Sequence, residues 1–315
     1  MSLPFVEEWL PGFDGHQFYT RTYPATFPKA VVLFVHGFAE HIGRYEQAHV
    51  QYPARSVTVF AFDLRGYGRT ALDGAHKSKD AAYGKTNWGW QMQDIEFFGK
   101  RLAQELPGIP LFLMGHSAGG GQTLAYFTRA SAPPTAEGAK LFTAAIAASP
   151  CLTLTHPKPK IVRWTGSKLA LIRPYQLISA DVGVENITRN TAVREAYAKD
   201  PLIKKMGTLK GLDDMLSGGE KLLTEDYQRW PKELPLFIMS GTADYVTSSK
   251  AAEEFYNKIP ATDKKISLFE ASLCSGGYHE LVHEPDGMAD RWVNESIEWI
   301  EAHIPAKSPP TESKL

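Results

Sequence analysis

The sequence predicts an α/β fold with a mostly parallel central sheet, flanking helices and an inserted helical cap. Apolar, strand-like runs alternate with helix-like runs up to about residue 150, as a parallel sheet with crossover helices requires. This alternation lapses in the middle of the chain and then resumes. We therefore expect a core built from residues 1–150 and 233–305, a helical cap at residues 151–232, and a flexible tail at residues 306–315.

The first buried strand is predicted at residues 30–35, which form an uninterrupted apolar run. The loop that follows begins with His36, Gly37 and Phe38. A glycine allows the backbone to turn sharply, so that the N–H of Phe38 can face a pocket at the end of the strand. We expect His36 to hold this loop through hydrogen bonds rather than to take part in chemistry.

The apolar run at residues 109–114 predicts a second buried strand, and Gly115-His116-Ser117-Ala118-Gly119 follows it directly. This G-x-S-x-G pattern is typical of a strained strand-to-helix turn that exposes a serine hydroxyl. Both glycines are required because the turn leaves no room for a Cβ beside the serine. Residues 120–127 can form the helix that must come next. Ser117 is therefore the candidate nucleophile.

An oxyanion hole is the next part that such a site requires. It is formed by the N–H of the residue after the nucleophile and by an N–H from the loop after an earlier strand. The first donor is expected to be Ala118. The second is expected to be Phe38, in the loop after residues 30–35.

The expected core also includes a strand at residues 265–269 and ends with an amphipathic run at residues 288–303. Cys151 lies just after the apolar run at residues 144–148. It is expected to be a buried small apolar residue rather than a reactive thiol.

A serine becomes a good nucleophile when a base removes its proton and an acid orients that base. The apolar run at residues 236–239 predicts a strand that leads to Asp244, and the loop after the next strand contains His279. Ser117, Asp244 and His279 therefore occur in the chain order that this type of site uses. His283 is a rival base. We favour His279 because it directly follows a flexible Gly-Gly-Tyr turn.

Several motifs together resemble those of α/β-hydrolases of the monoacylglycerol lipase branch, in the serine aminopeptidase S33 group. The resemblance covers nearly the whole chain. The segments that carry it are Val35-His36-Gly37-Phe38-Ala39-Glu40-His41, Gly43-Arg44-Tyr45, Asp63-Leu64-Arg65-Gly66-Tyr67-Gly68, Gly115-His116-Ser117-Ala118-Gly119-Gly120, Asp200-Pro201-Leu202, Gly241-Thr242-Ala243-Asp244 and Tyr278-His279-Glu280-Leu281.

This resemblance implies specific roles for residues of the chain. It implies a triad of Ser117, Asp244 and His279, and oxyanion donors at Phe38 and Ala118. Glu40 and Arg44 fall where the family has polar residues near the glycerol end of the substrate. His283 is a further candidate for substrate binding, although it is expected on the following helix, beside the site or exposed. The chain departs from the family pattern in its loop at residues 271–277, which is longer than the usual step from strand to histidine.

The resemblance implies a serine hydrolase that cleaves monoacylglycerols to fatty acid and glycerol through an acyl-enzyme. Other serine hydrolases with the same triad stay open: a lysophospholipase, a short-chain esterase, a thioesterase or a proline iminopeptidase. The peptidase needs carboxylates for a substrate ammonium, a role that Glu40 leaves open, and the thioesterase needs a basic pocket. A non-catalytic binding protein is disfavoured because the triad is complete.

Composition narrows the choice of partners. The 315 residues carry a net charge of −1, which argues against nucleic acid as a partner. The 2 cysteines do not make a disulfide framework, and their spacing suits no metal site, so we infer no metal. The expected serine mechanism needs no cofactor. No apolar run reaches membrane-spanning length and no secretory signal is visible, so an intracellular location is expected.

Two segments carry expectations about location. Basic residues, Trp164 and aliphatic residues interleave at residues 158–164 and 168–173, with Gly166 expected to interrupt the helix between them. This segment either contacts a membrane or lipid-droplet surface, or packs its apolar face inward. The C-terminal Ser313-Lys314-Leu315 is a receptor-read peroxisomal address and predicts binding to the import receptor. The alternative location is the cytoplasm or a lipid-droplet surface.

Overall fold

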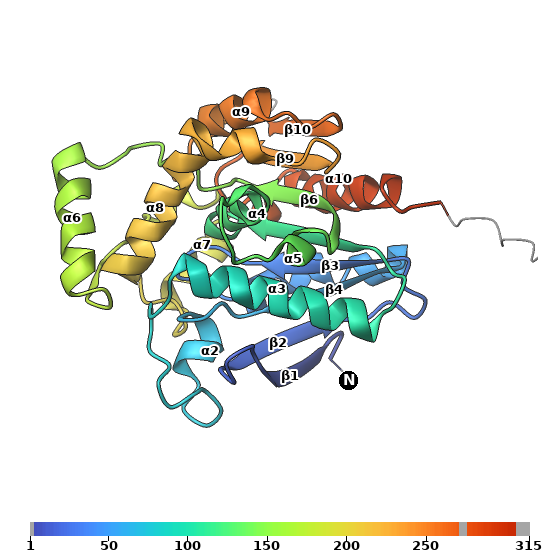
Figure 1. The fold of residues 1–315 in the computed structure, drawn as a ribbon, viewed down its shortest axis with the longest axis horizontal. Coiled ribbons are helices and arrows are strands. Elements are labelled where there is room, and N and C mark those ends of the chain that lie inside the picture. The colour runs from blue at the N-terminus through green and yellow to red at the C-terminus, as the bar shows by residue number, and fades with distance from the viewer. Residues whose placement is uncertain (1–2, 271–275, 307–315) are drawn as a thin grey trace, which may run out of the picture.

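The computed structural model describes residues 3–270 and 276–306. An eight-stranded sheet runs through the centre of the molecule (Figure 1). In spatial order its strands are β1 (Val6–Pro11), β2 (Gln17–Tyr23), β4 (Val57–Phe62), β3 (Ala30–Val35), β5 (Leu111–His116), β6 (Phe142–Ala148), β9 (Leu236–Gly241) and β10 (Lys264–Phe269).

The expected parallel arrangement is confirmed for most of this sheet. β2 pairs antiparallel with both β1 and β4, and the remaining pairs, from β4 to β10, are parallel. β3 has the predicted bounds, whereas β5 begins at Leu111, two residues later than the apolar run. Pro110 lacks an N–H for the ladder, and its carbonyl oxygen instead accepts a hydrogen bond from Val31.

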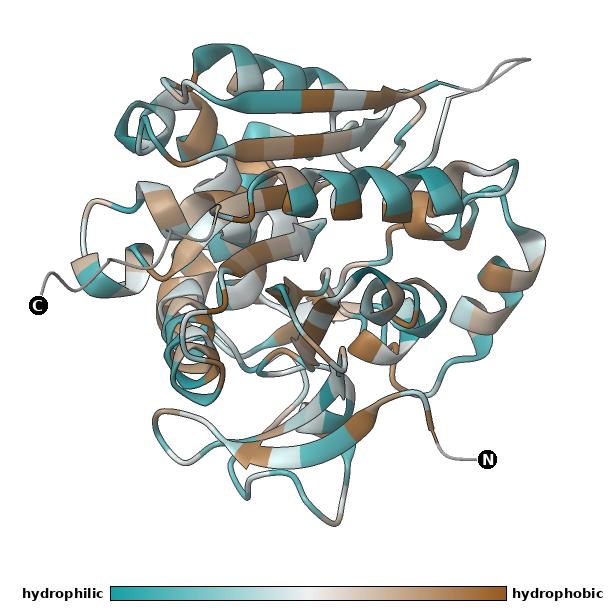
Figure 2. Ribbon diagram, turned by 90° about the vertical axis from the view of Figure 1, so that its right-hand side faces the viewer, coloured by the Kyte–Doolittle hydropathy of each residue, from teal (hydrophilic) through white to brown (hydrophobic). Residues whose placement is uncertain are grey.

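Helices cover both faces of the sheet because alternate strand residues point in opposite directions. In β3, Val31, Leu33 and Val35 join one core cluster, and Val32 and Phe34 join the other. The hydrophobic residues concentrate in these central strands (Figure 2). The first cluster is covered by α3 (Trp88–Glu105), α4 (Ala118–Thr128) and α9 (Ser249–Lys258), and the second by α1 (Glu46–His49) and α10 (Met288–Ala302).

A long insertion separates β6 from β9. Its elements are α6 (Lys160–Ile172), β7 (Leu177–Ser179), η3 (Val184–Asn186), α7 (Thr191–Lys199), β8 (Met206–Thr208), α8 (Leu209–Thr224) and η4 (Asp226–Arg229). β7 and β8 form a separate antiparallel pair. α8 packs against both α4 and α6, so that α6 stands at the edge of the molecule (Figure 1).

The expectation that Gly166 interrupts the helix in this insertion is wrong. α6 continues through Gly166 without a break. One glycine inside a helix costs only about 1 kcal/mol relative to alanine, which the neighbouring turns of α6 and its packing on α8 can offset.

The remaining short elements are η1 (Ile42–Tyr45), η2 (Tyr52–Arg55), α2 (Gly68–Leu72), α5 (Ala136–Ala139) and η5 (Leu281–His283). Within residues 3–270 and 276–306, no helix combines the length and the apolar character that crossing a membrane requires. Cys274 and the C-terminal Ser313-Lys314-Leu315 lie outside the described residues, as do residues 271–275 of the loop before His279.

Candidate active site

Ser117 stands on a sharp turn between β5 and α4. Its backbone has φ 54° and ψ −117°, a region that residues other than glycine rarely adopt. A Cβ on Gly115 would lie 2.2 Å from the carbonyl oxygen of Gly119, and one on Gly119 would lie 2.2 Å from that of Val35. Backbone atoms therefore crowd the turn from both sides, which is why both glycines are needed.

Ser117, His279 and Asp244 form one chain of hydrogen bonds. Nε2 of His279 lies 2.8 Å from Oγ of Ser117, and Nδ1 of the same ring lies 2.8 Å from Oδ2 of Asp244. A carboxylate can only accept, so Nδ1 carries the proton and Nε2 is left free to accept the serine hydroxyl proton. All three side chains are buried. The three residues predicted from the sequence are therefore brought together.

Local hydrogen bonds hold Asp244 in place. Its Oδ1 accepts from the backbone N–H groups of Val246 and Thr247, both at 2.8 Å. Its Oδ2 lies 2.8 Å from the hydroxyl of Thr247, in addition to the bond with His279. With both oxygens occupied, the carboxylate has a defined orientation from which to position the imidazole ring.

Two hydrogen bonds also hold the backbone of His279. Its carbonyl oxygen accepts from Oγ of Ser149 at 2.8 Å and from Nε2 of His116 at 3.2 Å. Burial disfavours the charged ring, but the neighbouring Asp244 carboxylate outweighs burial, and the pKa of His279 is raised. A raised pKa makes His279 a stronger base toward the Ser117 hydroxyl.

The loop after β3 closes over the serine. A Cβ on Gly37 would lie 3.1 Å from Cβ of Ser117, so the loop backbone runs close to the nucleophile. His36 holds this loop: Nδ1 bonds the carbonyl oxygen of Gly37 at 2.8 Å, and Nε2 accepts from the N–H of Leu64 at 2.8 Å. The structural role expected for His36 is confirmed. Phe38 and Ala118 both line a narrow pocket of about 10 Å³ at this point.

A buried ionic cluster adjoins the serine. Arg44 bonds Glu40 at 2.5 Å and both oxygens of Glu280 at 2.6 Å. Glu40 also accepts from the N–H of Gly37 and from the hydroxyl of Tyr45, each at 2.6 Å. Glu40 therefore connects the cluster directly to the loop that carries Phe38.

Charge pairing outweighs burial in this cluster. Burial opposes ionisation of both carboxyls. The Arg44 guanidinium nevertheless holds the pKa of Glu280 at about 2. Hydrogen bonding by His116, together with the charge of Arg44, holds the pKa of Glu40 well below its usual range. The sequence motifs include Glu280 only as part of the segment Tyr278-His279-Glu280-Leu281, without a role. Its position directly after His279 indicates that it lies near the site, but the motifs do not predict its pairing with Arg44.

The comparison with known protein families decides the family. The family model described as serine aminopeptidase, S33 matches residues 26–286. The chain belongs to this family.

Relatives named monoglyceride lipase support a narrower assignment. Monoglyceride lipase of Saccharomyces cerevisiae is 26% identical over 313 residues, which cover 95% of this chain and 94% of that protein. Human monoglyceride lipase is 27% identical over 307 residues, which cover 95% of this chain and 92% of that protein. A crystal structure of a soluble variant of the yeast enzyme in complex with a substrate analogue matches with a TM-score of 0.82 at 25% identity, covering 98% and 97% of the two chains. This S33 hydrolase is thus a monoacylglycerol lipase-like carboxylic ester hydrolase.

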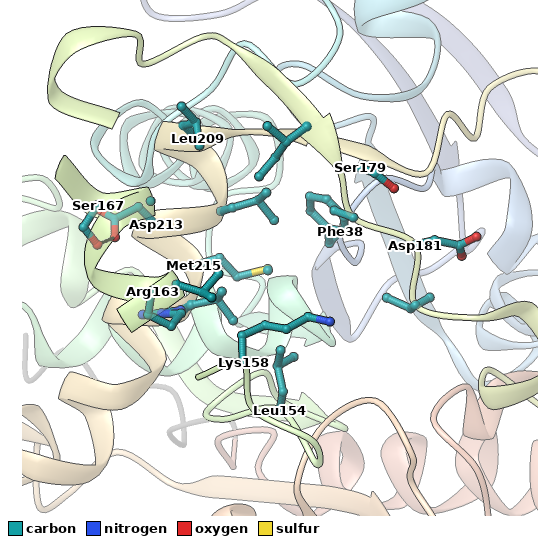
Figure 3. Close-up of a pocket in the computed structure, with 17 residues that line it drawn as sticks. Phe38, Leu154, Lys158, Arg163, Ser167, Ser179, Asp181, Leu209, Asp213 and Met215 are labelled. Carbon is teal, nitrogen blue, oxygen red and sulfur yellow. Dashed lines mark hydrogen bonds between the residues drawn. The ribbon is translucent and has the colours of Figure 1, made fainter. Parts of the chain in front are cut away.

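Two cavities of this S33 hydrolase adjoin near the serine, and Ser117 lines the smaller one. A small one of about 30 Å³ contains Ser117 and His279 and extends to Glu40 and Arg44. A larger, mostly apolar one of about 300 Å³ is lined mainly by residues of the insertion (Figure 3). Phe38 and Val182 line both cavities.

The candidate binding residue His283 lies elsewhere. Its Nδ1 bonds a carboxylate oxygen of Glu280 at 2.9 Å, and its Nε2 donates to the carbonyl oxygen of Arg44 at 2.8 Å. It lines a separate open cavity on the far side of Arg44, rather than the cavity that contains Ser117. The structure therefore places His283 behind Arg44 and Glu280, in contact with the cluster.

Cys151 is buried, and burial raises the pKa of its thiol to about 12, which keeps it protonated at neutral pH. Among the residues that the structure describes, no group of three or more His, Cys, Asp and Glu side chains is arranged to hold a metal ion.

Proposed function

We propose that this S33 hydrolase cleaves monoacylglycerols to fatty acid and glycerol, with Ser117 as the nucleophile. The observation that carries the proposal is the hydrogen-bonded chain from Ser117 through His279 to Asp244, beside a cavity for one apolar chain. The relatives named monoglyceride lipase support the choice of substrate.

The proposed reaction has two halves. His279 accepts the hydroxyl proton as Oγ of Ser117 attacks the ester carbonyl, and Asp244 stabilises the imidazolium that forms. The backbone N–H groups of Phe38 and Ala118 bind the oxyanion of the tetrahedral intermediate. His279 then protonates the leaving glycerol oxygen as the ester bond breaks. Water repeats the cycle on the acyl-enzyme, which releases fatty acid and restores the serine.

We further propose that the insertion, residues 151–232, acts as a cap that holds the acyl chain. The cavity of about 300 Å³ is at the lower end of the range for small-molecule sites, which suits one acyl chain better than two. Its lining from the insertion includes Val162, Leu212 and Leu216. The polyol end is placed toward Glu40 and Arg44, which line the smaller cavity with the serine.

The buried cluster favours this substrate over the alternatives. Arg44 already pairs with both Glu40 and Glu280, so these carboxylates are bonded inside the protein rather than free for a substrate ammonium. The same pairing leaves Arg44 committed, which disfavours a nucleotide phosphate at this position. A neutral polyol is the leaving group that best suits such a site.

Product release from a small panel of substrates tests the proposal. We expect the wild-type protein to release oleate from 1-oleoylglycerol much faster than from dioleoylglycerol or oleoyl-CoA. An alkyl fluorophosphonate should add to the peptide that contains Ser117, as read by tandem mass spectrometry. A preference for oleoyl-CoA would reassign the enzyme as a thioesterase, and labelling at another residue would contradict the nucleophile.

We also propose that α6 docks on a membrane or lipid-droplet surface. Large apolar side chains of α6 are exposed to solvent; they are Ile161, Val162, Trp164, Leu169, Leu171 and Ile172. Leu171 and Ile172 are 79% and 77% exposed, which is unusual for leucine and isoleucine. The lysines and arginines beside them favour a surface that contains anionic lipid.

Vesicle sedimentation tests this docking. The wild-type protein should pellet with vesicles of phosphatidylcholine and phosphatidylserine, and L171D/I172D should remain in the supernatant. F27D is the matched control, because Phe27 is 82% exposed but lies far along the chain from α6. Equal pelleting of L171D/I172D and the wild type would contradict docking through α6.

A further inference from the structure

The side chain of Phe38 occupies the junction between the cavities. It lines the larger apolar cavity, the cavity that contains Ser117, and the narrow pocket at Ala118. In Figure 3 the ring projects into the same space as the ends of Met215 and Lys158. An acyl chain that extends from Ser117 into the larger cavity must therefore pass the ring of Phe38.

Two neighbours fix the position of the ring. On one side Tyr67 packs against it edge to face, with the ring centroids 5.7 Å apart and an interplanar angle of 72°. On the other side lies Gly207 of β8, where a Cβ would be 2.8 Å from Cζ of Phe38. The ring thus occupies space that exists because residue 207 has no side chain.

We propose that Phe38 is a specificity-determining residue, whose ring and Val182 form a narrow passage between the serine and the acyl cavity. The acyl chain bound at Ser117 enters the larger cavity through this passage, so the ring sets which chains the enzyme accepts. This role belongs to the side chain and is separate from that of the Phe38 backbone N–H. The inference rests on the proposed function, because it assumes that an acyl group is attached at Ser117.

The size of the cavity at the serine makes the passage selective. The cavity that Ser117 lines has a volume of about 30 Å³, against about 300 Å³ for the apolar cavity, so a long acyl chain does not fit beside the serine. A long chain must therefore pass Phe38, whereas an acetyl group remains beside Ser117. Movement of the Phe38 ring should therefore lower kcat/KM for long-chain esters and leave kcat/KM for short-chain esters less affected.

The experiment measures kcat/KM for 1-oleoylglycerol and for 1-acetylglycerol and uses their ratio. In G207A the new methyl group pushes the Phe38 ring into the passage, so the oleoyl-to-acetyl ratio should fall by about 10-fold. In F38A/G207A the obstructing ring is gone, and the ratio should recover toward that of the wild type. G74A is the matched control, since a Cβ at Gly74 meets no atom within 4 Å.

A second variant keeps the test decisive if G207A folds poorly. F38W leaves Gly207 intact and enlarges the ring, so it should lower the ratio as G207A does. A wild-type ratio in a folded G207A and in F38W would overturn the inference while leaving the proposed function intact. Failure of the wild-type protein to cleave either glycerol ester would overturn the proposed function itself.

Discussion

At the scale of single residues, the orientation of His279 depends on Asp244. Replacing Asp244 with asparagine puts an amide where the carboxylate accepts the Nδ1 proton, which favours the wrong imidazole tautomer. We expect D244N to lower kcat for 1-oleoylglycerol by about 10⁴-fold while the protein remains folded. Steady-state kinetics with purified protein would measure this effect, and a loss below 10-fold would contradict the orienting role.

The raised pKa of His279 also predicts the pH dependence of the reaction. His279 must be neutral to accept the serine proton, so kcat/KM rises with pH as the imidazolium loses its proton. Because Asp244 raises this pKa, the midpoint of the rise should lie above the ordinary histidine value of 6.5. In D244N the midpoint should move to lower pH. A pH profile with the same midpoint in both proteins would contradict this cause.

Glu280 makes a separate prediction about stability. Its pKa is about 2 in the folded protein against an ordinary value of 4.5, so its contribution to stability is complete above pH 4.5 and is lost as the pH falls toward 2. We expect E280Q to be less stable than the wild type at pH 7, and the difference to shrink at pH 3. Urea unfolding at the two pH values measures the difference in the free energy of unfolding. The same difference at both pH values would show that the charge of Glu280 is not what stabilises the protein.

Among single residues, the sequence predicts those that a local motif places. Ser117 is determined by its turn, and Asp244 and His279 by their positions after strands, so their proximity could be predicted. Their catalytic roles stay predictions. Glu280 and His283 differ because their contacts come from Arg44, more than 200 positions away in the chain. A pattern in one segment does not encode such a contact.

At the scale of elements, the turn between β5 and α4 depends on the glycine on its helical side. A Cβ on Gly119 would lie 2.2 Å and 2.5 Å from the carbonyl oxygens of Val35 and His36, and neither can move without disrupting β3. Overpacking of this kind typically costs about 1–3 kcal/mol. We expect G119A to lower the melting temperature, whereas G74A should not. Equal melting of both variants would contradict the account of the turn.

Strands were easier to predict than helices in this chain. The continuous apolar run at residues 30–35 matches β3 because a strand buried on both faces needs apolar residues throughout. The path of α6 through Gly166 could not be read from the sequence, since packing on α8 outweighs the weak helix propensity of one glycine.

At the scale of the whole molecule, a buried acid joins the insertion to the core. Oε1 of Glu284 accepts from the hydroxyl of Thr188 and the N–H of Arg189 at 2.7 Å, and Oε2 accepts from the Arg189 side chain at 2.7 Å. E284A would remove the acceptor of the Arg189 N–H, whereas the Thr188 hydroxyl would keep its bond to the carbonyl oxygen of His283 at 3.1 Å. A buried donor left without a partner costs about 1–3 kcal/mol. We expect a lower melting temperature for E284A.

The control for that prediction is D286N. Asp286 also pairs with Arg189, but its side chain is 72% exposed, and exposed ion pairs contribute about 1 kcal/mol or less. D286N should therefore melt close to the wild type. Equal melting temperatures for E284A and D286N would contradict the role of Glu284 in joining the insertion to the core.

The shape of the larger apolar cavity is a property of the whole molecule that sequence motifs do not encode. It arises where Phe38 of the core meets Gly207 and Val182 of the insertion, three positions far apart in the chain. The alternation of strands and helices indicates that an insertion exists and where it begins and ends. The width of the passage depends on how those segments pack.

The most direct test of the central claim compares 1-oleoylglycerol hydrolysis by the wild type and by S117A. We predict that the wild type releases oleate and glycerol in equal amounts, and that S117A loses turnover by about 10⁶-fold. Circular dichroism should show that S117A is folded. Substantial oleate release by folded S117A would contradict the assignment of Ser117 as the nucleophile, and with it the mechanism proposed for this hydrolase.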